Sequence, residues 1–119
     1  MSGVIIAVVD DMFFVSKIRA VAEAVGTEIS FPRTRETLIQ KAREAKPRLI
    51  VVDLHSQKFD PAELAAELKA DDELRAIPLL GFFSHVQTEL QRKALNAGFD
   101  QVIPRSAFAR DLPKILAAD

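Results

Sequence analysis

The chain has 119 residues, of which 49% are hydrophobic and 28% charged, values typical of one folded domain. We therefore expect residues 1–119 to form a single domain. Its 16 basic and 17 acidic residues leave a net charge of -1, which argues against direct binding to nucleic acid. The chain has no cysteine, which excludes disulfides and thiolate chemistry and fits a reducing compartment such as the cytoplasm.

The first apolar segment, at residues 4–9, is short and ends directly on Asp10 and Asp11. It has no basic leader before it, so we expect neither a signal peptide nor a membrane span. Its length and composition instead predict a strand that is buried on both faces.

Short apolar runs then alternate with longer amphipathic stretches, which is the pattern of βα units in a parallel sheet. Strands are expected at residues 4–9, 28–31, 49–52, 79–83 and 101–103. Helices are expected at residues 14–25, 34–45, 60–68, 86–97 and 106–118.

Helix boundaries are marked by residues that favour them. Gly26 and Gly98 follow the first and fourth predicted helices, where a residue with positive φ often ends a helix. Asp60 is expected to cap the third helix, with Pro61 in its first turn. Pro113 is expected to interrupt or kink the last helix, because proline lacks the backbone N–H that a helix interior needs.

The polar residues that follow the strands are predicted to meet at one edge of the sheet. The first strand ends on Asp10 and Asp11, the third on Asp53 and the fourth on Ser84, while the fifth leads to Arg105. Right-handed crossovers leave few topologies for five strands and five helices, and ligands in open α/β sheets bind beyond the carboxyl ends of the strands.

Three carboxylates in one pocket raise one another's pKa values unless a cation is present. Mg²⁺ suits such a site because it prefers a few oxygen ligands and several waters. An aspartate nucleophile, a metal and the hydroxyl of Ser84 are together suited to forming an aspartyl phosphate. In a purely structural interpretation, Asp10 and Asp11 only cap a helix and Asp53 only ends a strand, but the convergence of so many groups favours a site.

The sequence resembles the receiver domains of two-component response regulators over essentially its full length. The resemblance is carried by Val8-Val9-Asp10-Asp11, Leu49-Ile50-Val51-Val52-Asp53-Leu54, Leu68-Lys69-Ala70 through Ala76-Ile77-Pro78-Leu79, and Ala97-Gly98-Phe99-Asp100. It implies a flavodoxin-like α/β fold, a three-layer α-β-α sandwich around a five-stranded parallel sheet of order 2-1-3-4-5.

The resemblance also implies roles for residues. Asp53 would accept a phosphoryl group from a histidine kinase or a phosphotransfer protein. Asp11, Asp53 and the backbone carbonyl of His55 would hold Mg²⁺, with Asp10 assisting, and Ser84 would follow the phosphoryl group. Such a protein signals by contact with a downstream protein partner, or as a homodimer, and is not an enzyme.

Three positions depart from the family pattern. Arg105 stands where the family has lysine, and Ser106 replaces the following proline, so we predict a trans peptide because a cis one costs roughly 2.5–4 kcal/mol. Val102 replaces an aromatic residue that moves on phosphorylation, and the loop at residues 55–60 lacks the usual Pro-Gly signals.

These departures leave an alternative, a pseudo-receiver that acts as an interaction or dimerisation module without control by phosphorylation. A flavodoxin-like cofactor binder is a weaker alternative, because no glycine-rich phosphate loop follows the first strand.

Three further features have both a functional and a simpler interpretation. His55 and His85 lie beside the acidic residues and could complete a transition-metal site, but we favour loop positions without that role. Met12 and Phe13 either border the pocket or, as we favour, fill irregular packing. The basic stretch at residues 33–48 either docks an acidic partner or, as is usual, forms a solvated helix face.

Overall fold

The computed structural model describes residues 3–84 and 87–117. Its strands are β1 (Ile5–Val8), β2 (Ile29–Ser30), β3 (Leu49–Asp53), β4 (Leu79–Phe83) and β5 (Gln101–Pro104). Its helices are α1 (Met12–Ala24), α2 (Arg35–Ala45), α3 (Pro61–Ala70), α4 (Thr88–Ala97), α5 (Arg105–Arg110) and α6 (Leu112–Ala117). The strands form one parallel sheet of order β2-β1-β3-β4-β5, which confirms the predicted flavodoxin-like fold.

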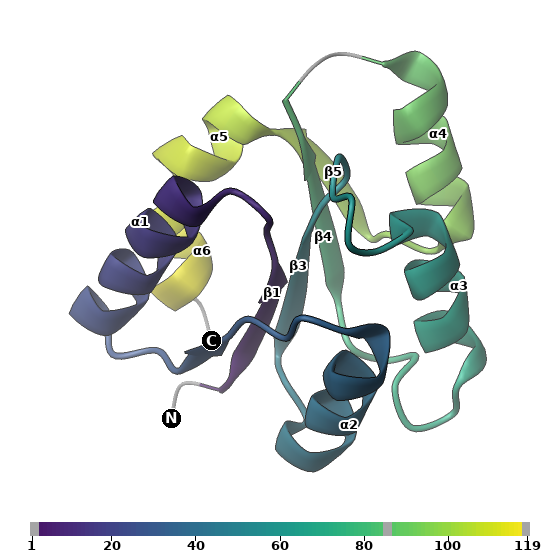
Figure 1. Cartoon of the computed structure of the whole chain (residues 1–119), viewed down its shortest axis with the longest axis horizontal. Coiled ribbons are helices and arrows are strands. Elements are labelled where there is room, and N and C mark those ends of the chain that lie inside the picture. The colour runs from purple at the N-terminus through teal and green to yellow at the C-terminus, as the bar shows by residue number, and fades with distance from the viewer. Residues whose placement is uncertain (1–2, 85–86, 118–119) are drawn as a thin grey trace.

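Helices cover both faces of this sheet, with α1, α5 and α6 on one face and α2, α3 and α4 on the other (Figure 1). Alternate residues of β1 enter different cores, because side chains of a strand point to opposite faces. Ile5 packs with Phe14 and Phe108 on the α1 face, whereas Ile6 packs with Leu64 on the other. The central strands are therefore buried on both sides, and polar residues come to the surface only where these strands end.

The predicted helix caps are present. The carboxylate of Asp60 accepts a hydrogen bond from the backbone N–H of Glu63 at the start of α3, and Pro61 is in the first turn. Gly26 follows α1 with a φ of 74°, and Gly98 ends α4 with a φ of 126°. These local signals explain why the helix boundaries were predicted closely.

The last predicted helix is two helices. The break falls at Asp111, and Pro113 lies in the first turn of α6 rather than inside a continuous helix. A proline in the first turn leaves no backbone donor unsatisfied, whereas one further inside would clash with the preceding turn. The fourth helix begins at Thr88 instead of residue 86, a position outside the described residues.

Two of the six basic residues in the stretch at residues 33–48 form ion pairs within the described chain. Arg35 lies 2.7 Å from the carboxylate of Glu67, and Arg43 pairs with Glu73 and Asp71, so basic α2 faces acidic residues in and after α3. These pairs account for part of the charge asymmetry of the sequence without an external partner. Across residues 3–84 and 87–117, no helix has the length and apolar character needed to cross a membrane.

Candidate functional site

Asp53 is the most buried acidic residue that the structure describes. It ends β3, which lies between β1 and β4, and is only 7% exposed. Its Oδ1 accepts a hydrogen bond of 2.9 Å from the backbone N–H of His55. Burial raises the pKa of Asp53 and the carboxylate of Asp10 adds to this, while the hydrogen bond and Arg105 oppose it. The carboxylate of Asp53 is therefore poorly solvated and lies near both a negative and a positive side chain, Asp10 and Arg105.

Asp10 connects the first strand to the loop after β3. Its Oδ1 accepts a hydrogen bond of 2.9 Å from the Ser56 hydroxyl, and its Oδ2 accepts one of 2.7 Å from the backbone N–H of Gln57. The sequence showed only that this loop lacks Pro-Gly signals and did not identify Ser56 or Gln57. The polar residues Ser56 and Gln57 in this loop were the only hint in the sequence. Which acid they bond to depends on the path of the loop, which the sequence pattern does not give.

Asp11 has both of the roles that the sequence suggested. As the N-cap of α1, its Oδ1 accepts hydrogen bonds from the N–H groups of Phe13 and Phe14 at 2.9 and 3.4 Å. Its Oδ2 lies 3.0 Å from Nη2 of Arg105. The bond from Arg105 is the main reason that the pKa of Asp11 is lowered.

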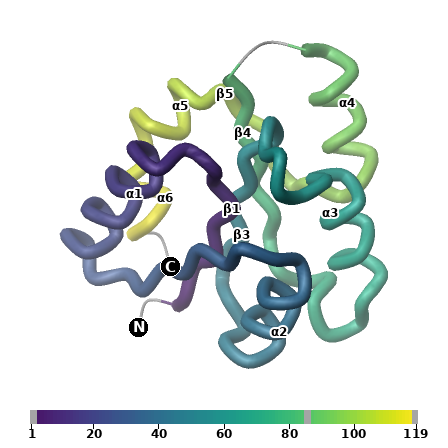
Figure 2. Tube along the Cα trace, in the orientation of Figure 1, coloured from purple at the N-terminus to yellow at the C-terminus, as the bar shows by residue number. Residues whose placement is uncertain are grey.

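Arg105 lies at the same edge of the sheet although it is distant from Asp11 in sequence. The starts of α1 and α5 lie near each other at this edge, as Figure 2 shows. The guanidinium of Arg105 lies 4.0 Å from the centre of the Phe14 ring, which is a close cation–π contact. The described chain has no cis peptide bond, so the predicted trans bond between Arg105 and Ser106 is confirmed.

The remaining predicted residues are placed less completely. Ser84 is exposed just after β4. His85 lies outside the described residues, so the transition-metal alternative stays an untested prediction. His55 contributes its backbone N–H to Asp53. Phe13 is 90% exposed and Met12 is 64% exposed, so the prediction that both fill irregular packing is wrong.

The site has the ligand chemistry of a magnesium centre but not its arrangement. Carboxylate oxygens from Asp10, Asp11 and Asp53 are the donors that Mg²⁺ prefers. Within the described part of the chain, no three acidic or histidine side chains are placed to hold a metal ion together. Arg105 and the amides of α1 engage Asp11, and Ser56 and Gln57 engage Asp10. Binding of a metal through Asp11 therefore requires Arg105 to release it.

Solved structures with the same architecture are receiver domains. The phosphorylated cyanobacterial phytochrome response regulator RcpA aligns with a TM-score of 0.80 and 22% identity, covering 98% of this chain and 90% of RcpA. The receiver domain of the sensor histidine kinase PA1611 from Pseudomonas aeruginosa, with magnesium in its active-site cleft, aligns with a TM-score of 0.81 and 17% identity, covering 98% and 95%. The chain thus has the receiver fold of two-component response regulators.

Sequence comparison agrees with this fold. The response regulator protein VraR of Staphylococcus aureus is 35% identical over 74 residues, which cover 62% of this chain and 34% of VraR. The match thus spans about a third of the curated relative. No protein-family profile matches the chain.

Proposed function

We propose that this chain is a signalling receiver that accepts a phosphoryl group on Asp53 with the help of Mg²⁺ and transmits its state through protein contacts. The observation that carries the proposal is the buried Asp53 carboxylate at the end of a central strand, with Asp10 and Arg105 close enough to influence its pKa. The phosphorylated state of RcpA and the magnesium in PA1611 support the same chemistry by analogy.

In this reaction a carboxylate oxygen of Asp53 forms a bond to phosphorus as the bond between phosphorus and the donor's imidazole nitrogen breaks. Mg²⁺, when bound, would supply positive charge that offsets the negative charge of the phosphoryl oxygens. Asp11, Asp53 and the backbone carbonyl of His55 would hold it, and Asp10 would assist. Arg105, once released from Asp11, pairs with the phosphoryl group, since guanidinium suits such oxygens well. Ser84 donates its hydroxyl to the same group.

The partners in this proposal are a histidine kinase or phosphotransfer protein and a downstream protein, in the cytoplasm. In this proposal the chain accepts a phosphoryl group and transmits a signal by protein contact, and it is not an enzyme. The similarity to VraR, a response regulator, supports this class of partners.

A second candidate is a pseudo-receiver that binds partners without phosphorylation. It is favoured by the fact that each acid of the site already has a protein partner. Asp10 is bonded to the loop after β3, Asp11 to Arg105 and to α1, and Asp53 to His55. In this interpretation the acids hold the edge of the sheet together.

The two candidates are separated by treating the protein with phosphoramidate and Mg²⁺ and measuring its mass. The receiver proposal predicts a single phosphoryl adduct that Asp53→Asn lacks and that Asp72→Asn, altered at an exposed acid, retains. Beryllofluoride with Mg²⁺ is expected to shift amide signals around Asp53 in the unaltered protein. If neither reagent produces a change that depends on Asp53, the pseudo-receiver candidate is favoured and the receiver proposal is wrong.

A further inference from the structure

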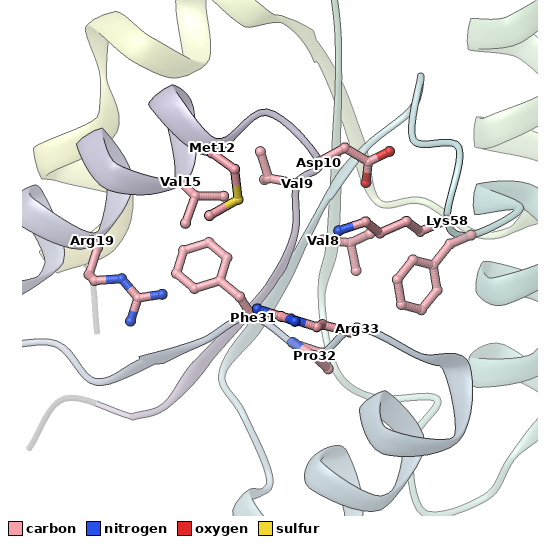
Figure 3. Close-up of a pocket in the computed structure, with 11 residues that line it drawn as sticks. Val8, Val9, Asp10, Met12, Val15, Arg19, Phe31, Pro32, Arg33 and Lys58 are labelled. Carbon is pink, nitrogen blue, oxygen red and sulfur yellow. The ribbon is translucent and has the colours of Figure 1, made fainter.

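A small pocket opens beside Asp10, and Arg105 is not among the residues that line it (Figure 3). It lies between α1, the segment at residues 31–33 after β2, and the loop after β3, and has a volume of about 90 Å³. Its apolar walls include Val8, Met12, Val15, Phe31 and Phe59. The receiver proposal assigns no role to this pocket.

Three cationic side chains line the pocket, each from a different segment. Arg19 comes from α1, Arg33 follows β2, and Lys58 belongs to the loop after β3. In Figure 3 the charged ends of Arg19 and Lys58 reach inward from opposite sides, with Arg33 at the edge between them. The pocket has one acid, Asp10, so the cations outnumber the acid by three to one.

These cations are not neutralised within the described chain. Most other arginines form ion pairs, among them Arg35 and Arg43, but no ion pair involves Arg19, Arg33 or Lys58 across residues 3–84 and 87–117. The guanidinium of Arg19 instead stacks over Phe31 at 4.9 Å, which holds it at the pocket.

The acid in the pocket offsets only one of the three positive charges, and it forms no ion pair with any of them in the described chain. Both oxygens of Asp10 accept hydrogen bonds from the loop after β3, one from Ser56 and one from Gln57. The remaining excess of positive charge around the pocket is unfavourable, and an anion bound between the three cations would reduce it.

The size of the pocket limits the anion. A single water occupies about 10–15 Å³ of such a cavity, so the pocket has room for a phosphate group but not for a nucleotide or a peptide. Guanidinium and ammonium groups together favour phosphate oxygens, because arginine binds them in pairs and lysine adds a compact charge.

We propose that this pocket binds a small phosphate-bearing anion, held between Arg19, Arg33 and Lys58. The site is separate from Asp53 and needs no phosphoryl transfer. Lys58 is adjacent to Gln57, whose N–H holds Asp10, so an anion on Lys58 stabilises the loop in the position in which it engages Asp10. Anion binding therefore disfavours any rearrangement that releases Asp10 from this loop. By thermodynamic linkage, release of Asp10 weakens anion binding to the same extent.

The test is a titration of the full chain with pyrophosphate in the presence of EDTA, followed by amide signals. Saturable shifts are expected at residues 31–33 and 56–59. Arg33→Gln and Lys58→Gln are each expected to weaken binding by at least about tenfold, which corresponds to about 1.4 kcal/mol. Both side chains are exposed, so the variants should fold, and a thermal melt checks this.

Lys17→Gln is the matched control, because Lys17 is an exposed cation on α1 that does not line the pocket. It should bind pyrophosphate as the unaltered protein does. Equal weakening in this control, or equal shifts with sodium chloride at matched ionic strength, would overturn the proposal, since either result means general screening. Asp53→Asn should bind normally, so failure of the receiver proposal leaves this outcome unaffected.

The source of the phosphate group is distinguished by parallel titrations with inorganic phosphate, glycerol phosphate and acetate. Binding of inorganic phosphate and pyrophosphate alone assigns the site to free phosphates, and binding of glycerol phosphate extends it to small phosphate esters. Acetate binding as strong as phosphate binding would contradict the proposed selectivity.

Discussion

The carboxylate of Asp53 is held in a protein environment that favours its protonated form. Burial raises its pKa above that of the unfolded chain, so the folded state loses stability as pH rises from the pKa of the unfolded chain to the raised value, and the loss is complete above that value. Asp53→Asn removes this charge and is expected to stabilise the protein at pH 7 by about 1.4 kcal/mol for each unit of the shift.

Chemical denaturation in EDTA from pH 3 to pH 8 measures this effect. The difference between Asp53→Asn and the unaltered protein should grow as pH rises and disappear at the acid end, where Asp53 is protonated in both states. A difference of constant size would mean that the substitution acts through packing and not through charge. Asp72→Asn, at an exposed acid, is the control.

Arg105 competes with a metal for Asp11. Its Nη2 lies 3.0 Å from the carboxylate of Asp11. Its Cζ lies 4.0 Å from the centre of the Phe14 ring, a cation–π contact that helps to hold the guanidinium there. Arg105→Gln removes the positive charge from Asp11 and is expected to tighten Mg²⁺ binding by about tenfold, the usual consequence of about 1.4 kcal/mol. Isothermal titration with Mg²⁺ measures this effect.

The matched control for this prediction is Arg110→Gln, which removes an exposed cation of α5 that pairs with Asp111. It should leave the affinity for Mg²⁺ unchanged. The same Arg105→Gln variant should raise the pKa of Asp11, because the bond from Arg105 is the main cause of its lowering. Weaker Mg²⁺ binding in Arg105→Gln would show that Arg105 assists the metal instead of competing with it.

The sequence predicted which residues meet at this edge, because strands of one parallel sheet bring their carboxyl ends together. It did not predict that Arg105 bonds to Asp11 or that Ser56 bonds to Asp10. These contacts depend on side-chain conformations and on the path of the loop after β3, which no local pattern encodes.

At the scale of elements, Gly98 sets the turn between α4 and β5. Its φ of 126° is rarely adopted by other residues, and an added Cβ would lie 2.6 Å from Cγ of Lys69. Lys69 has little freedom to move, since its amino group donates to the carbonyls of Arg75 and Ile77 and to Asp100. Gly98→Ala is therefore expected to destabilise the protein by about 2–3 kcal/mol, from backbone strain together with the clash.

Gly26→Ala is the matched comparison for this prediction. Gly26 also has a positive φ, of 74°, but an added Cβ would meet no atom within 4 Å. Gly26→Ala should thus lower the free energy of unfolding by only about 1 kcal/mol, which is the backbone penalty alone. Urea unfolding of both variants measures the difference, and equal costs would show that the contact with Lys69 is relieved easily.

Elements were predicted best where a local signal marks their ends. Asp60 and Pro61 define the start of α3, and Gly98 defines the end of α4. The split of the last helix was predicted less well, because proline is compatible with either a kink or a new first turn. Packing of Phe108 and Leu112 into the same core, on either side of Asp111, decides between them.

At the scale of the whole molecule, the sheet separates two hydrophobic cores, one on each face. On one face, Phe82 and Phe108 stack with ring centres 4.7 Å apart, and Phe14 packs edge-on against both. Phe14 also contacts Arg105, so this core reaches the acidic site directly. On the other face, Val102 packs against the cluster that contains Ala94 and Phe99.

This arrangement predicts a local response to phosphorylation. Val102 is partly buried against the second core and has a single side-chain torsion, so it cannot exchange an exposed position for a buried one as a large aromatic residue can. Beryllofluoride with Mg²⁺ is therefore expected to shift amide signals near Asp53, Asp11 and Arg105, while those of α4 and β5 change little.

Val102→Tyr supplies the comparison, because it restores a side chain large enough to occupy two positions. In that variant the same treatment should extend the shifts into β5 and α4, provided that a thermal melt shows the variant to be folded. Extensive shifts across β5 and α4 in the unaltered protein would contradict the argument, since motion would then pass from Asp53 without an aromatic residue at position 102. In the proposed receiver, a local response would place the surface that a partner contacts at the acidic edge itself, where Phe13 is 90% exposed beside Asp11.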